Sequence, residues 1–470
     1  MAEGRPGHGE AAPGDHLQTG YQLWLVGHEL EHGRAPWRDP YSFQPEVKPR
    51  WNLAGWPFGL PYWPLRGALG TVLGWNVFVL LGFLGAGACA ALWLREIGLR
   101  RSAALTGGFA FSLAPYLQAQ WSAGHLLAWV AMLLPLSLFS LERARRASAA
   151  WFVLAGAALA SIPLSGQLHL ALAAIPFFVL YAACRSSGLL PGALVGAGAA
   201  LAAGAFADLV AVRETTGANG RSFAQVERYS ADAGDFVSRN TNEIEQVVFL
   251  GWTVLALALL GLALLVLSGR WRLATALGIG ALVPTLMALG ANLPGYETLW
   301  RHLPGLENTR VPERLMPVAC LALAALVAIS VSRARWPGTA ALVMVLLLVD
   351  LHMGLVHATA ADEHNRAYAA LRSEPRGRLL ELPVYRPDDQ KASVYLYYAM
   401  QAPRERPAGY STTTPLNADT RLRELRRSPC SELAGLGVRY LAVHLGRRNP
   451  CSGQLLARDG PVAAYRLTSP

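Results

Sequence analysis

One carboxylate near the start of the chain stands where a helix is expected to begin. Asp15 follows Gly14, and apolar residues at helical spacing start two positions later at Leu17. An aspartate in that place is typically an N-cap, worth about 1 kcal/mol to the helix. A carboxylate held on ordered backbone near a membrane surface is also a candidate catalytic group. A cap and a catalytic residue therefore remain as alternatives.

Arginines next to an apolar stretch form a second candidate group. Arg310 and Arg314 are four residues apart where an apolar segment begins, so they are predicted to share one helical face. Guanidinium groups bind phosphate through paired hydrogen bonds. Arg301 and His302 precede them in the same polar loop. The alternative is that these side chains reach lipid headgroups, and both interpretations stay open.

Two polar residues, Gln120 and His125, flank an apolar segment and are further candidates for substrate binding. Packing or interfacial placement is the more typical role of such residues. No metal-ligand spacing such as CxxC or HExxH occurs. The sequence therefore assigns no metal ligand and leaves the use of a divalent metal open.

Long uncharged segments must position these residues. A bilayer core needs roughly 17–25 apolar residues per helix, and lipid offers the backbone no hydrogen-bond partners. The pattern predicts a mainly α, polytopic bundle of about 10 spans between residues 67 and 356. The segments are 68–94, 103–118, 125–141, 150–164, 168–183, 189–212, 247–268, 273–289, 315–331 and 338–355.

Arginine placement predicts the orientation of this bundle. Alternate gaps between the segments carry arginines, and the positive-inside rule puts such gaps in the cytoplasm. The loops 213–246 and 290–314 and both termini are then extracytoplasmic. The basic gaps contain Arg95, Arg100 and Arg101; Arg143, Arg145 and Arg146; Arg185; Arg270 and Arg272; and Arg333 and Arg335.

Composition supports a membrane protein. Apolar residues make up 53% and charged residues 15%, too few charges for an ordinary soluble surface. The net charge of +10 could indicate a nucleic-acid partner. The arginines that set the topology account for much of that excess, so no nucleic acid is expected.

Two further regions flank the bundle. Residues 1–66 are predicted to form an extracytoplasmic loop with an amphipathic helix, from Asp15 to near Gly33, lying in the membrane interface. Residues 357–470 are predicted to form a small soluble α/β domain. Its expected strands are 379–384 and 438–443, and its expected helices are 422–427 and 431–436. Cys430 and Cys451 lie in this tail, where they could pair or stay free.

The beginning of the chain is unusual for a polytopic protein. More than sixty polar and aromatic residues precede the first span, and they contain no signal-peptide h-region. Either the first helix exports this stretch, or a span that precedes Met1 in a longer form has been lost. We expect the second.

Several short motifs, taken in order, resemble the GT-C superfamily, the multi-span glycosyltransferases that take sugars from polyprenyl-phosphate carriers. Each motif is short, and their order over most of the chain is the stronger signal. They are Gly14-Asp15, 112–116 running to Gly124-His125, 229–232 with Asp235-Phe236, 249–251, 310–314 and 436–440.

The resemblance implies roles for the candidate residues. Asp15 would be the general base that accepts a proton from the acceptor hydroxyl. Arg310 and Arg314 would stabilise the charge on the leaving lipid phosphate. Asp232 or Asp235 would be a second carboxylate or a metal ligand.

The resemblance also implies the substrates and the setting of the reaction. The donor would be a polyprenyl-phosphate sugar, and the acceptor a cell-envelope polymer, a lipid or a protein. The chain would lie among the lipids of a bacterial plasma membrane. The rivals are a transporter or lipid-handling protein and an inactive envelope scaffold. A transporter is expected to carry charges and broken helices at mid-membrane, whereas this chain carries its polar residues in loops.

Overall fold

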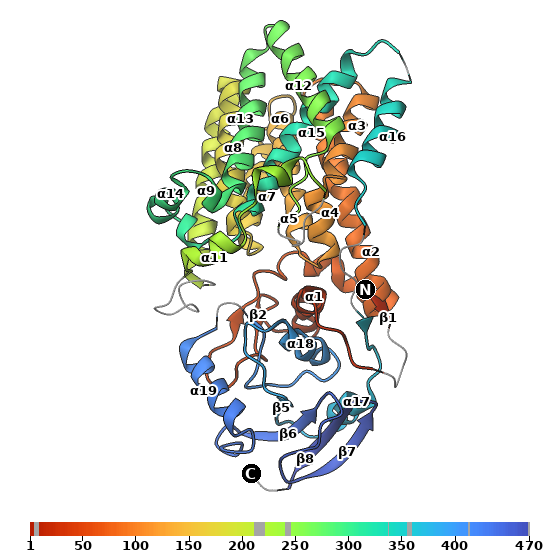
Figure 1. The fold of residues 1–470 in the computed structure, drawn as a ribbon, viewed down its shortest axis with the longest axis vertical. Coiled ribbons are helices and arrows are strands. Elements are labelled where there is room, and N and C mark those ends of the chain that lie inside the picture. Colours follow the sequence, from red (N-terminus) through yellow and green to blue (C-terminus); the bar gives the residue numbers. More distant parts are fainter. Residues whose placement is uncertain are drawn as a thin grey trace.

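The computed structural model describes residues 1–3, 9–210, 221–239, 246–336, 338–354, 360–411 and 414–468. A long helical bundle stands on a smaller α/β layer, with α1 (Asp15–Glu31) between them (Figure 1). This confirms the predicted mainly α bundle with a C-terminal α/β domain. Residues 213–220 and 240–245 of the predicted loop 213–246 lie outside the described residues.

Each of the ten predicted apolar segments contains helix. The predicted segment 103–118 is broken, because Pro115 lacks an N–H and cannot continue the helix before it. The bundle helices are α2 (Gly59–Glu96), α3 (Arg101–Ser112), α4 (Pro115–Ser122), α5 (Leu127–Ala131), α6 (Leu133–Ala144), α7 (Ala150–Leu164), α8 (Leu168–Arg185), α9 (Leu190–Asp208), α12 (Trp252–Leu267), α13 (Trp271–Ala288), α15 (Met316–Arg333) and α16 (Thr339–Leu351).

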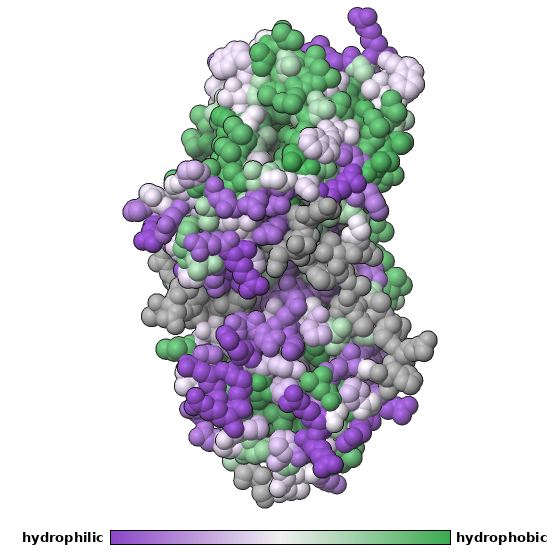
Figure 2. All heavy atoms as spheres, in the orientation of Figure 1, coloured by the Kyte–Doolittle hydropathy of each residue, from purple (hydrophilic) through white to green (hydrophobic). Residues whose placement is uncertain are grey.

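Six helical stretches in the described part of the chain are long and apolar enough to cross a membrane, and α7, α12 and α16 are shorter apolar helices. Large apolar side chains on the outer helices face away from the protein, with Val195 75%, Leu267 84% and Val349 68% exposed. Apolar residues gather on the surface of the upper part of the molecule (Figure 2). Helix α15 runs through the interior with almost every residue buried. The chain is a multi-pass membrane protein.

The basic connections gather at one end of the bundle. Arg143 pairs with Glu96 at 3.0 Å, and Arg185 pairs with Glu142 at 2.6 Å, which joins the ends of α2, α6 and α8. Arg100 donates to the Val331 carbonyl at 2.6 Å. The turn from α12 to α13 lies at the end of the bundle away from the C-terminal layer (Figure 1). This clustering agrees with the arginine pattern, and the side of the membrane remains a prediction.

The C-terminal domain is built on a four-stranded sheet with the order β5-β6-β8-β7. Strands β5 and β6 are parallel, and the other two pairs are antiparallel. The strands are β5 (Arg378–Leu382), β6 (Val438–Val443), β7 (Gly453–Asp459) and β8 (Val462–Leu467), and the helices are α17 (Arg366–Ser373), α18 (Ser393–Ala399) and α19 (Leu416–Arg427).

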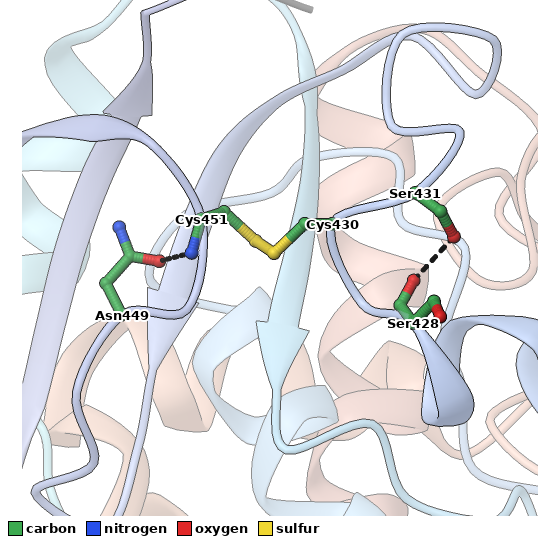
Figure 3. The surroundings of a disulfide bond; sticks show 5 residues. All are labelled: Ser428, Cys430, Ser431, Asn449 and Cys451. Carbon is green, nitrogen blue, oxygen red and sulfur yellow. Dashed lines mark hydrogen bonds between the residues drawn. A yellow bond between two sulfur atoms is a disulfide. The ribbon is translucent and has the colours of Figure 1, made fainter.

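The structure confirms both predicted strands of this domain, as β5 and β6, and the predicted helix 422–427, which lies within α19. The predicted helix 431–436 is wrong, because these residues form turns. A disulfide joins Cys430, after α19, to Cys451, before β7, with 5.5 Å between the two Cα atoms (Figure 3). The open question of their pairing is thereby answered.

Helix α1 is confirmed in its bounds but not in its predicted environment. It packs against α2 on one side and α18 on the other, and its buried residues include His16, Tyr21 and Glu29. An amphipathic helix lying on lipid would leave one face uncovered, so the interfacial prediction does not match this burial. Short strands complete the region, with β1 (Ala2–Glu3) on β4 (Ala360–Ala361) and β2 (Arg38–Asp39) on β3 (Arg50–Trp51). Shorter helices are α11 (Phe223–Arg228) and α14 (Tyr296–His302).

Candidate active site

The Asp15 carboxylate does not cap its helix. Gly14 is the N-cap of α1, and no side-chain hydrogen bond caps the helix there. Asp15 Oδ2 instead accepts a hydrogen bond from His125 Nε2 at 2.8 Å. Asp15 Oδ1 accepts longer bonds from the Tyr410 hydroxyl at 3.2 Å and from Gln390 Nε2 at 3.4 Å. The capping alternative is therefore wrong, and the carboxylate joins the bundle to the C-terminal domain.

The surroundings of Asp15 keep it ionised. Burial alone would raise the pKa of the Asp15 carboxyl, but the hydrogen bond and charge of His125, with the bonds from Gln390 and Tyr410, lower it to about 2. The side chain keeps 26% of its surface exposed. Asp15 is thus a part-exposed, permanently charged acceptor at neutral pH.

The turn between α4 and α5 places His125 beside Asp15. His125 Nδ1 lies 2.6 Å from Gln120 Oε1, and the Gln120 side chain is fully buried. Gly124 has a φ of +82°, and a Cβ there would lie 2.5 Å from the backbone nitrogen of His16. Only glycine fits so close to the first turn of α1. The structure therefore brings together Asp15, His125 and Gln120, which the sequence had given as separate candidates.

The candidate arginines do not share an α-helical face. Arg310 precedes the 3-10 turn η8 (Pro312–Leu315), and Arg314 lies within that turn. The predicted helical spacing fails because Pro312 starts the turn, and α15 begins only at Met316. The Arg310 guanidinium lies 5.6 Å from the centre of the Tyr229 ring.

A third arginine, Arg221, belongs to the same neighbourhood. Burial, which is the largest cause, and the positive charges of Arg310 and Arg314 together lower the pKa of Arg221 to about 10. Like charges act on one another in this way only when they are close. Sequence reasoning did not single out Arg221, because no spacing relates it to residues ninety positions away.

Tyr410 connects the arginines to the carboxylate. Burial and the Asp15 charge raise the pKa of the Tyr410 hydroxyl well above its usual value, while the charge of Arg310 acts to lower it. Arg310 is thus within electrostatic range of the residue that donates to Asp15. Gln390 and Tyr410 were both missed by the sequence, since isolated polar residues in a soluble tail carry no periodic signal.

The other candidates make local contacts. Arg301 pairs with Glu297 at 2.5 Å on the exposed surface of α14, and His302 Nδ1 lies 2.8 Å from the Thr298 carbonyl oxygen. Asp235 Oδ2 accepts from the Asp232 backbone at 2.8 Å in the turn η4 (Ala233–Phe236).

Asp232 Oδ1 accepts from Asn292 at 3.0 Å. Among the described residues, no group of three His, Cys, Asp or Glu side chains is placed to hold a metal ion. No residue of this part of the chain is therefore assigned to a metal.

A cavity of about 590 Å³ has Tyr410, a hydrogen-bond donor to Asp15, in its wall. The loop between α1 and α2 forms one side, including β2 and β3. Asn417 and Ser411 of the C-terminal domain form another, and Gly166 and Val210 mark the end of the bundle. The cavity therefore lies at the junction of all three regions of the chain.

Comparison with solved structures identifies the fold. The arabinofuranosyltransferase AftD from Mycobacteria matches 97% of this chain with a TM-score of 0.56 and 15% sequence identity. This chain spans about 40% of the length of AftD. The likeness shows that this chain shares its fold with that arabinofuranosyltransferase, and the shared fold agrees with the resemblance noted from the motifs.

Two further structures agree less well. The oligosaccharyltransferase AglB from Archaeoglobus fulgidus matches 93% of this chain and 66% of its own, with a TM-score of 0.45 and 12% identity. ArnT from Cupriavidus metallidurans matches 97% and 94%, with a TM-score of 0.40 and 13% identity. The assignment rests on the likeness to AftD. No model of a known protein family matches the sequence, and no curated protein is similar to it.

Proposed function

We propose that this protein is a membrane glycosyltransferase that moves a sugar from a polyprenyl-phosphate donor to an acceptor outside the cytoplasm. The observation that carries the proposal is the Asp15 carboxylate, which is ionised, part-exposed and held by His125 where the bundle meets the C-terminal domain. The similar AftD is an arabinofuranosyltransferase by name. Transfer of a pentose or a hexose is compatible with the site.

Asp15 acts on the acceptor in the proposed reaction. The acceptor hydroxyl binds at Oδ1, whose two hydrogen bonds of 3.2 and 3.4 Å are long and easily replaced. The hydroxyl oxygen attacks the anomeric carbon of the donor sugar and forms the new glycosidic bond. Its proton passes to Asp15. A carboxylate with a pKa of about 2 is a weak base, so its larger contribution is to orient the hydroxyl and stabilise the positive charge at the attacked carbon.

The arginines act on the leaving group. As the new bond forms, the bond between the anomeric carbon and the phosphate oxygen breaks, and the lipid phosphate leaves with the electron pair. Arg310 and Arg314 carry the charge that balances this phosphate, as the resemblance implies, and Arg221 joins them. Three nearby guanidinium groups repel one another, and a bound phosphate relieves that repulsion.

The first test is sugar transfer by the purified protein. Radiolabelled polyprenyl-phosphate hexoses and pentoses are offered with membrane extract as acceptor, and Asp15→Asn is the paired variant. Asp15→Asn is expected to lower transfer by roughly 100-fold to 10,000-fold, the usual contribution of a positioned acid–base group. Normal turnover by a folded Asp15→Asn protein would remove Asp15 from the site. No transfer by any form would favour a transporter or an inactive scaffold.

A further inference from the structure

A short segment directly before Asp15 lies against the C-terminal domain, and we call this segment, residues 9–14, the strap. Its described backbone is neither helix nor strand. Pro13 favours extended backbone at Ala12, which keeps α1 from beginning earlier. Ala11 and Gly14 are nevertheless buried. Buried N–H groups outside regular secondary structure need partners elsewhere in the protein.

Two hydroxyl groups of α18 accept hydrogen bonds from the strap. The Gly14 N–H donates to Ser393 Oγ at 3.1 Å. The Ala11 N–H donates to the Tyr398 hydroxyl, also at 3.1 Å. Both hydroxyl-bearing side chains are fully buried, and their helix packs against α1 (Figure 1). Because a buried N–H without a partner costs free energy, these two hydroxyls determine where the strap lies.

A carboxylate holds the far end of the strap. Glu10 Oε2 lies 2.9 Å from His444 Nδ1 and accepts a longer bond from the Leu445 N–H at 3.4 Å. His444 is buried after strand β6, and its other ring nitrogen, Nε2, lies 2.9 Å from the Tyr368 hydroxyl. The imidazole is thus held from both sides, and Glu10 is bound at one defined place on the domain.

The two ends of the strap are joined by one buried network. The rings of Tyr368 and Tyr398 stack with 4.4 Å between their centroids and 5° between their planes. The Tyr398 hydroxyl donates to Asp362 Oδ2 at 2.7 Å, so its proton points away from Ala11 and its oxygen accepts. A buried hydrogen-bond network of this kind specifies a single geometry. Loss of Glu10 is therefore expected to loosen the bond to Ala11 as well.

The strap fixes the peptide next to Asp15 on both sides. The Gly14 carbonyl accepts the first hydrogen bond of α1, from the Leu17 N–H at 3.0 Å. The N–H of the same residue is held by Ser393. The backbone of Asp15 is therefore fixed in direction, and its side chain meets His125 at 2.8 Å.

Resting on the proposed function, we propose that the strap is the means by which the C-terminal domain positions the catalytic carboxylate, and that Ser393 and Glu10 are positioning residues. Neither of them touches a substrate in the proposed reaction. Gln390 lies in the 3-10 turn η9 (Gln390–Ala392) directly before α18 and donates to Asp15 Oδ1 at 3.4 Å. The start of α18 thus holds both the backbone beside Asp15 and its side chain.

Hydrogen exchange of the full-length protein in nanodiscs tests the contact without any substrate. The two bonded strap amides are expected to exchange slowly in the wild type. Ser393→Ala and Glu10→Ala are each expected to speed this exchange roughly tenfold or more. Ser373→Ala is the matched control, since Ser373 lies exposed on α17 and bonds within its own helix. Equal exchange of the strap in the wild type and both strap variants would overturn the proposal.

Steady-state transfer separates positioning from a merely structural role. Ser393→Ala and Glu10→Ala are expected to lower kcat roughly tenfold to 100-fold, because a misplacement of about 1 Å costs about 100-fold in rate. The KM for the donor should stay unchanged, since the strap does not contact the arginines proposed to hold the donor phosphate. Glu10→Gln is expected to recover most of the rate, because its amide oxygen still accepts from His444.

Thermal unfolding shows which variants are folded. If Ser393→Ala fails to fold, Glu10→Ala decides the question, because Glu10 is partly exposed. A normal kcat in a folded variant whose strap exchanges fast would reject the positioning role. A wild type that transfers no sugar would reject the proposed function, whereas its exchange data would still confirm or reject the contact between strap and domain.

Discussion

At the scale of residues, the role of Asp15 depends on a histidine 110 positions away. The short bond from His125 fixes one carboxylate oxygen and stabilises its charge, which leaves the other oxygen for a substrate. His125 touches no substrate in this scheme, so it is a positioning residue. Loss of His125 is therefore expected to change the protonation of Asp15 more than the binding of substrate.

His125→Ala should change the pH dependence of transfer. Loss of the hydrogen bond and charge of His125 raises the pKa of Asp15 from about 2 toward its usual range near 4. Transfer by the wild type is expected to stay level from pH 7 to pH 4, while transfer by the variant falls below about pH 5. The measurement is the pH profile of kcat/KM, and coincident acidic limbs would contradict it.

The same shift sets a stability window. The pKa of Asp15 is lower in the folded chain than its unfolded value of 3.8, so its contribution is fully present above pH 3.8 and is lost as pH falls through about 2. Since each pKa unit corresponds to 1.36 kcal/mol, the contribution is about 2 kcal/mol at most.

At the scale of elements, the close contact between the α4–α5 turn and the start of α1 determines where His125 lies relative to Asp15. Gly124→Ala places a methyl group against the His16 backbone and forces a strained φ. A misplacement of about 1 Å at the chemistry costs roughly 100-fold in rate, so transfer should fall by about that factor.

Gly198→Ala is the matched control for this variant, because Gly198 lies in α9 with open space around it. Transfer and thermal unfolding are measured for both proteins. Equal activity of the two would show that the turn tolerates the methyl group.

The sequence predicted some elements well and others poorly for physical reasons. The uniformly apolar segments could be recognised as helices from their composition alone, without knowledge of the residues that they contact. Strand β7 was missed because its residues are mostly half-exposed and lack an alternating apolar pattern. The turn at 431–436 was taken for a helix because its apolar residues pack onto the sheet core without helical backbone. Of the site, single residues were predictable, but contacts between Asp15 and Tyr410, 395 positions apart, depend on tertiary packing.

At the scale of the whole molecule, orientation can be tested directly. Ser268 lies exposed in the α12–α13 connection at the basic end of the bundle, and Ser373 lies exposed on α17 of the C-terminal domain. The positive-inside rule puts the first in the cytoplasm and the second outside.

Single cysteines at these positions report the two sides of the membrane. A membrane-impermeant maleimide added to intact cells is expected to label Ser373→Cys and not Ser268→Cys, while inside-out vesicles reverse the result. The wild-type background measures reaction at the existing cysteines. Labelling of both positions from one side would contradict the predicted topology.

The hydrogen bond between Asp15 and Tyr410 joins residues that are 395 positions apart, and this separation has a consequence for biogenesis. The ribosome makes the carboxylate before the membrane bundle and two of its hydrogen-bond donors after the bundle. A nascent chain therefore holds an incomplete site until residues 390–410 emerge and fold. Until then, Oδ1 of Asp15 has neither of these two donors.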